Sequence, residues 1–224
     1  MSGTIDLATA QRVLGRDVLG PDEVGAAFGG GPAIPPIPYS VAELEAAVPA
    51  GECLVLRAER DSHGPLTLLR LIERFPDAFD QRLLRTMGYQ LKDDWGIELE
   101  PRAATDVCVA GWILVRKQIL DASRNQPYVE QISALARYAT QLGVPPSRVR
   151  RRSAVEIAYD LILYRAARGE RLLADTWDWS NSLTVDAGYL NIGGFGKDGM
   201  QILSYSPAVR HGALGVCPAR LPHG

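Results

Sequence analysis

The sequence has few cysteines and histidines, and their positions argue against a metal site or a disulfide framework. Its 224 residues include three cysteines and three histidines, with no CxxC pair. A structural zinc site usually needs four Cys or His ligands in paired spacings. Cys108 and Cys217 lie in apolar, strand-like segments, and the sequence leaves open whether they are neighbours. We expect reduced, buried thiols in a cytoplasmic protein, with no metal ion and no cofactor.

The chain also lacks a long apolar run and an excess of charge of either sign. Its longest apolar run, residues 107–115, has nine residues, whereas a membrane-spanning helix needs about twenty. The N-terminal residues have neither the basic flank nor the apolar region of a secretory signal. The formal net charge is -2 and 46% of the residues are hydrophobic. These values predict an ordinary globular protein that neither spans a membrane nor binds nucleic acid through bulk charge.

Capping signals and turn residues divide residues 1–104 into short helices. Asp6 precedes one predicted helix as an N-cap, and Ser40 and Glu43 form a capping box before another. The Gly- and Pro-rich residues 29–39 predict an extended connector, because they suit neither a helix nor a central strand. We expect helices over residues 7–14, 21–28, 42–48, 66–75 and 79–87, a buried strand over 52–57, and a loop over 88–102.

The pattern changes over residues 105–224, where strand-like segments dominate. Residues 193–199 are rich in glycine, but Asp198 stands where a phosphate-binding loop has Ser or Thr, so we expect a hairpin. The tail, residues 218–224, has too much Pro and Gly to pack well. Further helices are expected over 128–142 and 157–167, and strands over 107–115, 174–179, 189–192, 200–205 and 213–217. The predicted fold is α+β, with a helical N-terminal region packed on a mixed domain that has two helices and an antiparallel sheet.

A cluster of arginines is the one strongly basic segment. It consists of Arg148, Arg150, Arg151 and Arg152. Such a cluster could contact an anion or an acidic protein partner. The alternative is a solvated loop with salt bridges, which the slightly acidic chain and the absence of interleaved aromatic residues favour.

Aromatic residues gather near the C-terminus. Five of the sixteen aromatic residues, Trp177, Trp179, Tyr189, Phe195 and Tyr205, fall within thirty positions. Alternation along a strand places Trp177 and Trp179 on the same face. That face is either part of the core or an exposed platform for a sugar, a peptide or a partner protein.

The order of segments in the C-terminal half resembles a known scaffold. Arg152-Ser-Ala-Val-Glu156 leads into a helix, and Trp177-Asp-Trp-Ser-Asn181, Tyr189-Leu-Asn-Ile192 and Gly215-Val-Cys-Pro-Ala-Arg220 follow it. This order resembles C-type-lectin-like domains of the formylglycine-generating-enzyme type, which implies a scaffold that displays loops. The catalytic cysteine pair, the histidine set and the calcium-binding sugar motifs of such domains are missing, which argues against catalysis.

A second resemblance covers more of the chain. Ile34-Pro-Pro-Ile-Pro-Tyr-Ser40, Trp112-Ile-Leu-Val-Arg-Lys117 and Trp179-Ser-Asn181 are similar to segments of an uncharacterised bacterial protein family. This resemblance implies no particular activity.

Three classes of function remain open at this point. The leading hypothesis is a non-enzymatic recognition protein that binds a protein or a small ligand through Trp-rich loops. The alternatives are an enzyme that uses Asp178 or His211, and a component of a phage-derived or secretion assembly that docks a neighbour through the connector. The oligomeric state is left open. The candidate ligand contacts are Trp177, Asp178, Trp179, Asn181, Tyr189, Arg210 and His211.

Overall fold

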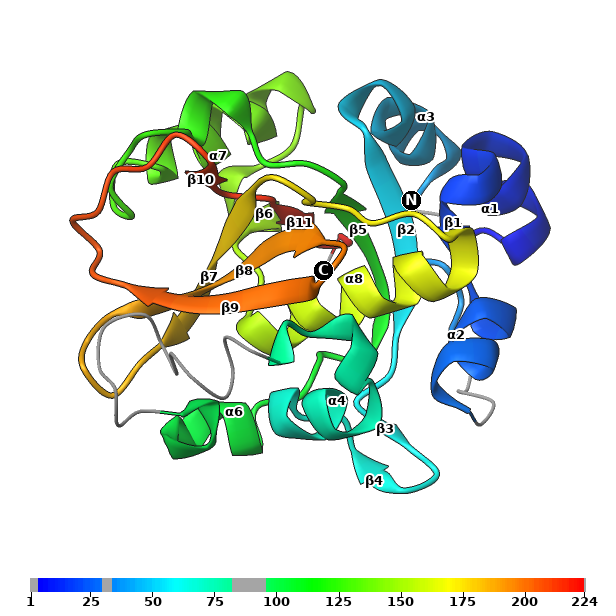
Figure 1. Ribbon diagram of the computed structural model, residues 1–224. Helices are drawn as coiled ribbons and strands as arrows, with labels where there is room; N and C mark the ends of the chain where they lie inside the picture. Colours follow the sequence, from blue (N-terminus) through cyan, green and yellow to red (C-terminus); the bar gives the residue numbers. More distant parts are fainter. Residues whose placement is uncertain (1–3, 30–33, 82–95, 224) are drawn as a thin grey trace.

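The computed structural model describes residues 4–29, 34–81 and 96–223, and it has an α+β fold (Figure 1). The helices are α1 (Leu7–Leu14), α2 (Pro21–Phe28), α3 (Val41–Ala50), α4 (Leu68–Arg74), α6 (Pro101–Thr105), α7 (Ile132–Gln141) and α8 (Ala154–Arg168). Short 3-10 helices are η1 (Gly15–Asp17), η2 (Pro76–Ala78), η3 (Ile97–Leu99), η4 (Asp121–Ser123) and η5 (Pro146–Arg148). No helix in these ranges is long and apolar enough to cross a membrane.

Local capping explains where the principal helices begin. The Asp6 side chain accepts a hydrogen bond from the Thr9 backbone N–H, which starts α1. Capping boxes begin α3 at Ser40 and α8 at Ser153. These three helix starts confirm the predictions made from the sequence.

A five-stranded sheet joins both parts of the chain. Its strands, in spatial order, are β1 (Val18–Leu19), β2 (Glu52–Arg57), β5 (Gly111–Arg116), β11 (Ala219–Arg220) and β6 (Val149–Arg150). Strands β1 and β2 precede residue 105 and the other three follow it, while one hydrophobic cluster runs from Ala10 to Ala219. The expected boundary between residues 104 and 105 therefore does not separate two cores.

The C-terminal tail corrects the expectation that it would pack little. Ala219 and Arg220 form β11, which pairs antiparallel with both β5 and β6 in the interior of the sheet. The Arg220 side chain is 1% exposed and forms an ion pair with Glu52. The Tyr39 hydroxyl donates a hydrogen bond to the Arg220 carbonyl at 2.6 Å. The tail is thus a structural part of the sheet.

A second sheet carries the aromatic residues. Its order is β10 (Leu214–Gly215), β7 (Trp177–Leu183), β8 (Tyr189–Gly196) and β9 (Gly199–Tyr205), with β10 parallel to β7 and the other pairs antiparallel. A two-residue turn joins β8 to β9, which confirms the predicted hairpin. A further two-stranded ribbon is formed by β3 (Arg60–Asp61) and β4 (Gly64–Pro65).

The central helix α8 packs against one face of this second sheet (Figure 1). All residues of α8 from Ala154 to Tyr164 are buried, and the helix contacts β7 and β8 (Figure 1). Leu190 and Ile192 share the main core with α8, so they mark the inner face. Trp177 and Trp179 alternate with these positions and lie on the opposite, outer face.

Several predicted element bounds differ from the structure. Phe79 forms a parallel bridge with Met200 instead of starting a helix, and most of that predicted helix, residues 82–87, lies outside the described residues. Residues 88–95 of the predicted loop also lie outside the described residues. Within the rest of that predicted loop, Pro101 starts α6, where proline is tolerated because the first N–H groups of a helix have no partner within it. The strand predicted from residue 107 begins at Gly111, and the helix predicted from residue 128 begins at Ile132.

Candidate functional site

Stacked aromatic rings cover part of the outer face of the second sheet. The rings of Tyr128 and Tyr189 are parallel to within 7°, with centroids 3.9 Å apart. Tyr128 also meets Trp179 edge to face at 5.3 Å. The Arg151 guanidinium lies 3.9 Å from the Tyr128 ring centroid, a distance at which cation–π attraction holds both groups. These contacts fix the orientation of the tyrosines.

Two loops from distant parts of the chain lie over the same face. The backbone N–H of Asn125 donates to the His211 carbonyl at 3.1 Å, and that of Tyr128 donates to the Pro207 carbonyl at 2.9 Å. Arg210 strengthens this junction through an ion pair with Glu130 at 2.8 Å. The loops therefore bring residues 121–131 and 206–213 together above the sheet.

The structure brings five residues of these elements into one surface. His211 meets Trp177 edge to face with centroids 6.2 Å apart. Tyr128, Trp177 and Tyr189 are half-buried, whereas Arg210 and His211 are exposed. We call this set (Tyr128, Trp177, Tyr189, Arg210 and His211) the aromatic site. Four of the five were predicted from the sequence. Tyr128 was missed because it is distant in sequence from strands β7 and β8 and comes into contact with Tyr189 only when the chain folds.

Two of the predicted ligand contacts have a different role, and a third lies at the surface nearby. Trp179 is 0% exposed, so its side chain belongs to the interior and not to a contact surface. Asp178 is also 0% exposed and points to the inner face of the sheet. These two placements correct the expectation that both side chains face a ligand. Asn181 is exposed on β7.

Asp178 is held by an arginine and a backbone amide. Two guanidinium nitrogens of Arg152 donate to its carboxylate at 2.8 and 3.1 Å, and the Cys217 backbone N–H donates to it at 2.7 Å. Burial raises the pKa of Asp178 above its usual value, although Arg152 acts in the opposite direction. Asp178 and His211 lie on opposite sides of the sheet and do not form a catalytic pair.

The arginine cluster is largely internal. Arg148, Arg151 and Arg152 are each at most 7% exposed, and Arg150 is half-buried. Arg148 pairs with Glu43 at 2.6 Å. Arg151 donates to carbonyl groups beneath the aromatic site, including that of Trp179. The expectation of an anion contact at the surface is corrected, since carboxylate and carbonyl groups of the same chain are the partners of these side chains.

A buried ionic network lies between α8 and the sheets. Arg57 donates to Glu156 at 2.6 Å and to Asp160 at 2.5 and 2.9 Å. Arg152 joins Asp160 to Asp178, and Arg150 adds a second bond to Glu156. Sequence reasoning missed Arg57 and Asp160. The available signal was two acidic residues four positions apart in an otherwise apolar helix, because buried carboxylates require cationic partners.

The electrostatics of this network stabilise charged side chains in the interior. Burial alone would raise the pKa of Glu156, but Arg57 and Arg150 outweigh it and lower the pKa to about 2. Glu156 therefore stays ionised at neutral pH. A carboxylate of this kind is a poor general base and serves as an anchor for the arginines.

The three cysteines are free and buried. Burial raises the pKa of the Cys53 thiol to about 12 and also raises the pKa values of Cys108 and Cys217. The Cys217 thiol donates to the Arg116 carbonyl at 2.6 Å. No disulfide joins Cys108 to Cys217, and none of the three thiols suits nucleophilic chemistry.

The connector packs on its own chain. Ile37 pairs with Ile5 in an isolated bridge, and Tyr39 is 0% exposed. The Trp112 indole N–H donates to the Pro35 carbonyl at 2.9 Å. Of its described apolar residues, Ile34 is well exposed, at 59%.

Comparisons with known proteins add no relative. No protein-family model matches the chain, and neither a curated protein nor a solved structure matches it. Within residues 4–29, 34–81 and 96–223, no group of three or more His, Cys, Asp or Glu side chains could hold a metal ion. The function is therefore inferred from the geometry of the sites.

Proposed function

We propose that the protein is a non-enzymatic recognition protein and that the aromatic site contacts a protein partner. The observation that carries this proposal is the half-exposed Tyr128–Tyr189 stack, held from beneath by Arg151. Aromatic and arginine side chains are enriched in the energetically important parts of protein interfaces. Because these rings are already ordered, binding would cost little side-chain entropy.

The surroundings of the site supply further support. Arg210 and His211 are exposed beside the rings and can donate hydrogen bonds at the rim. Leu183, the cross-strand partner of Tyr189, is 45% exposed and adds apolar area. A surface with apolar rings and a polar rim is typical of a site that binds another protein.

We also propose that the C-terminal half works in the manner of a C-type-lectin-like scaffold. The antiparallel strands β7, β8 and β9, and the loop over residues 206–213 that lies beside them, support a surface displayed on a rigid sheet. The three unpaired thiols fit a reducing, cytoplasmic location. The enzyme hypothesis has less support, because Asp178 is buried and bonded to Arg152.

The proposal is tested by binding measurements on matched variants. Proteins captured by the wild-type chain are identified, purified and titrated against Trp177→Ala, Tyr189→Ala and the control Val48→Ala, whose side chain is 55% exposed on α3. We expect the two aromatic variants to bind more weakly by about tenfold or more, the range of interface hot spots, with unchanged circular dichroism. Equal affinity in all three variants would refute the role of the aromatic site.

A further inference from the structure

Part of strand β5 has a neighbouring strand on one side only. Strand β2 pairs with all six residues of β5, whereas β11 pairs with only two of them, Leu114 and Val115. In the described parts of the chain, residues 111–113 therefore keep a free edge on the side of β11. A free edge presents backbone N–H and C=O groups to which another extended chain can bind.

The Tyr39 hydroxyl lies where β5 and β11 separate. The Arg116 N–H donates to the Pro218 carbonyl at 3.0 Å, as in a regular antiparallel ladder. Two residues further along, the Leu114 N–H donates to the Tyr39 hydroxyl at 3.2 Å. This hydroxyl donates in turn to the Arg220 carbonyl at 2.6 Å. A side chain thus bridges the two strands at the last pair of their ladder.

A proline prevents the tail from continuing the ladder. In the same register, the next residue of β5 whose N–H and C=O face the tail is Trp112, and the residue opposite it is Pro222. Proline has no N–H and cannot donate to the Trp112 carbonyl. The tail follows η5 instead, since the Leu221 N–H donates to the Arg148 carbonyl at 2.7 Å. No backbone hydrogen bond from residues 221–223 reaches Trp112.

A pocket of about 320 Å³ lies between this edge of β5 and the tail. It is lined by residues 109–113, residues 221–223 and the side chains of Arg57 and Arg150, and we call it the β5 slot. Val109 is 71% exposed, so the slot opens to solvent. Both arginines are already paired with Glu156. Apolar side chains and the backbone of β5 therefore remain as contacts for a ligand.

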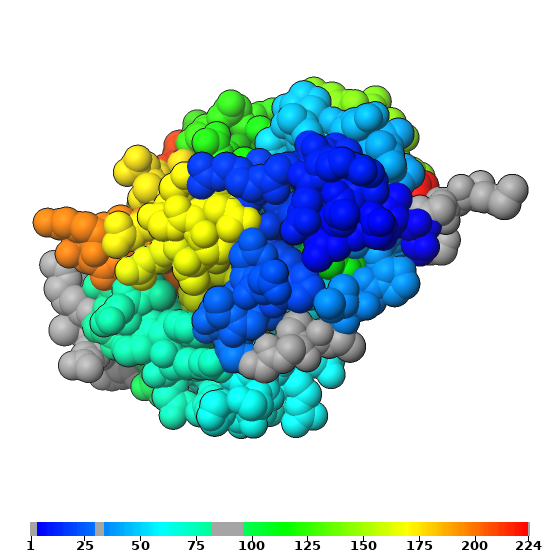
Figure 2. Space-filling model, turned by 90° about the vertical axis from the view of Figure 1, so that its right-hand side faces the viewer, coloured from blue at the N-terminus to red at the C-terminus, as the bar shows by residue number. Residues whose placement is uncertain are grey.

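Strand β5 is held in place while this edge stays free. The Trp112 indole N–H is bonded to the Pro35 carbonyl, which ties the strand to the connector. Helices α1 and α2 (blue) cover the neighbouring side of the molecule, which Figure 2 shows. Because the edge is already ordered, binding along it costs little conformational entropy.

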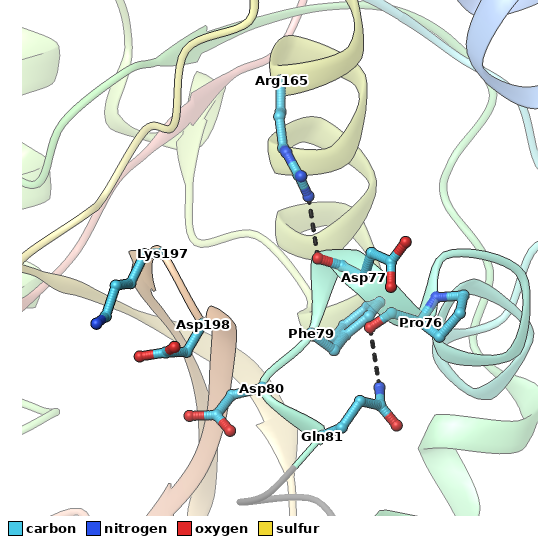
Figure 3. Close-up of a pocket in the computed structure, with 8 residues that line it drawn as sticks. All are labelled: Pro76, Asp77, Phe79, Asp80, Gln81, Arg165, Lys197 and Asp198. Atoms are coloured by element: carbon cyan, nitrogen blue, oxygen red, sulfur yellow. Dashed lines mark hydrogen bonds between the residues drawn. The ribbon is translucent and has the colours of Figure 1, made fainter.

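A charged pocket elsewhere lacks such convergence. It lies between α8, η2 and the turn that joins β8 to β9, and its volume is about 580 Å³. In Figure 3, Asp77 points away from Lys197 and Asp198, which lie on the opposite side of the pocket. In the β5 slot, by contrast, the two backbone groups belong to one residue, Trp112, and face the same space.

We propose that the β5 slot binds an extended, uncharged peptide segment of a partner protein, which adds to β5 as a short strand. The peptide backbone donates to the Trp112 carbonyl and accepts from the Trp112 N–H, the two groups that the tail leaves unbonded. Alternate side chains of the peptide contact the apolar lining. A charged side chain loses its hydration and finds the arginines already neutralised.

This interface is additional to the aromatic site. The slot belongs to the five-stranded sheet, whereas the aromatic site lies on the outer face of the second sheet. Either proposal can therefore fail without the other.

The proposal is tested by NMR titration of the ¹⁵N-labelled full-length protein. The probes are two uncharged peptides, acetyl-Thr-Val-Thr-Val-Thr-amide and acetyl-Ser-Leu-Ser-Leu-Ser-amide. We expect saturable shifts of the Trp112 amide resonance and slower deuterium exchange of that amide, because it gains an acceptor. Analogues methylated on every backbone nitrogen keep the side chains but cannot donate, and should bind more weakly by about tenfold or more.

Matched variants locate the binding to the slot. Ala110→Trp fills the slot from an exposed position and should weaken peptide binding by about tenfold or more. The control Ala104→Trp adds the same side chain at an exposed position on α6 outside the slot, and should bind as the wild type does. Analytical ultracentrifugation shows whether a second copy of the chain occupies the slot. The proposal is overturned by a dimer that Ala110→Trp dissociates, by no saturable binding of either peptide at millimolar concentration, or by equal binding in the two variants.

Discussion

Replacing Arg152 with methionine tests whether the arginine cluster is an internal support. Arg152 is 2% exposed and is the ion-pair partner of Asp178, while Asp160 keeps a second partner in Arg57. The substitution would thus leave one buried carboxylate without a cation. Removal of one partner from a buried ion pair costs about 3–5 kcal/mol. At about 2–4 °C per kcal/mol for a chain of this size, the melting temperature should fall by roughly 6–20 °C.

Urea unfolding measures the free energy of unfolding and thermal unfolding measures the melting temperature, both followed by far-UV circular dichroism, with two comparison variants. Arg210→Met breaks the exposed pair with Glu130, whose side chains are 51% and 50% exposed, and should cost less than about 1 kcal/mol. In the double variant Arg152→Met/Asp178→Asn, the buried charge is gone, and we expect part of the stability to return. Equal, small losses for Arg152→Met and Arg210→Met would refute the account of a buried network.

Three further predictions concern stability. The pKa of Glu156 is lowered to about 2, so its ionised form stabilises the fold by about 3 kcal/mol. This contribution is complete above pH 4.5 and is lost as the pH falls towards 2. When urea unfolding is measured across that interval, Glu156→Gln should lose less stability than the wild type. Trp179→Ala should destabilise the protein by about 3–5 kcal/mol, and Trp177→Ala by clearly less, in the same denaturation assay; similar losses would contradict the burial difference. Deletion of residues 219–224 removes β11 from the interior of its sheet and should abolish cooperative unfolding in calorimetry, whereas deletion of 223–224 should leave a single transition.

Helix starts could be predicted because their signals are local. An N-cap side chain and the backbone amide it binds lie three residues apart, so Asp6, Ser40 and Ser153 identify their helices without knowledge of the fold. The α+β class also follows from such local patterns. Strand β11 could not be predicted in this way, because its two residues acquire strand structure only by pairing with β5 and β6.

The sequence predicts on which face of the strand the two tryptophans of the candidate site lie, but it does not predict which of them is buried. Alternation correctly places Trp177 and Trp179 on one face, but loops from residues 121–131 and 206–213 decide which of the two is exposed. The arginine cluster shows the same limit. One of the two carboxylates that hold Arg152 in the interior belongs to Asp178, which is 26 positions away, and no local pattern joins them.

The central claim is that the outer face of the second sheet contacts a partner protein. The most direct test is photocrosslinking in cells. The photoreactive residue p-benzoylphenylalanine is placed at position 183, beside Tyr189, in one variant and at position 48 on α3 in another, and cells that express each variant are irradiated. Leu183 and Val48 are both exposed, at 45% and 55%. The account predicts a discrete crosslinked partner from position 183 alone, lost when Trp177→Ala is added. The same adducts from both positions, or adducts from position 48 alone, would contradict it.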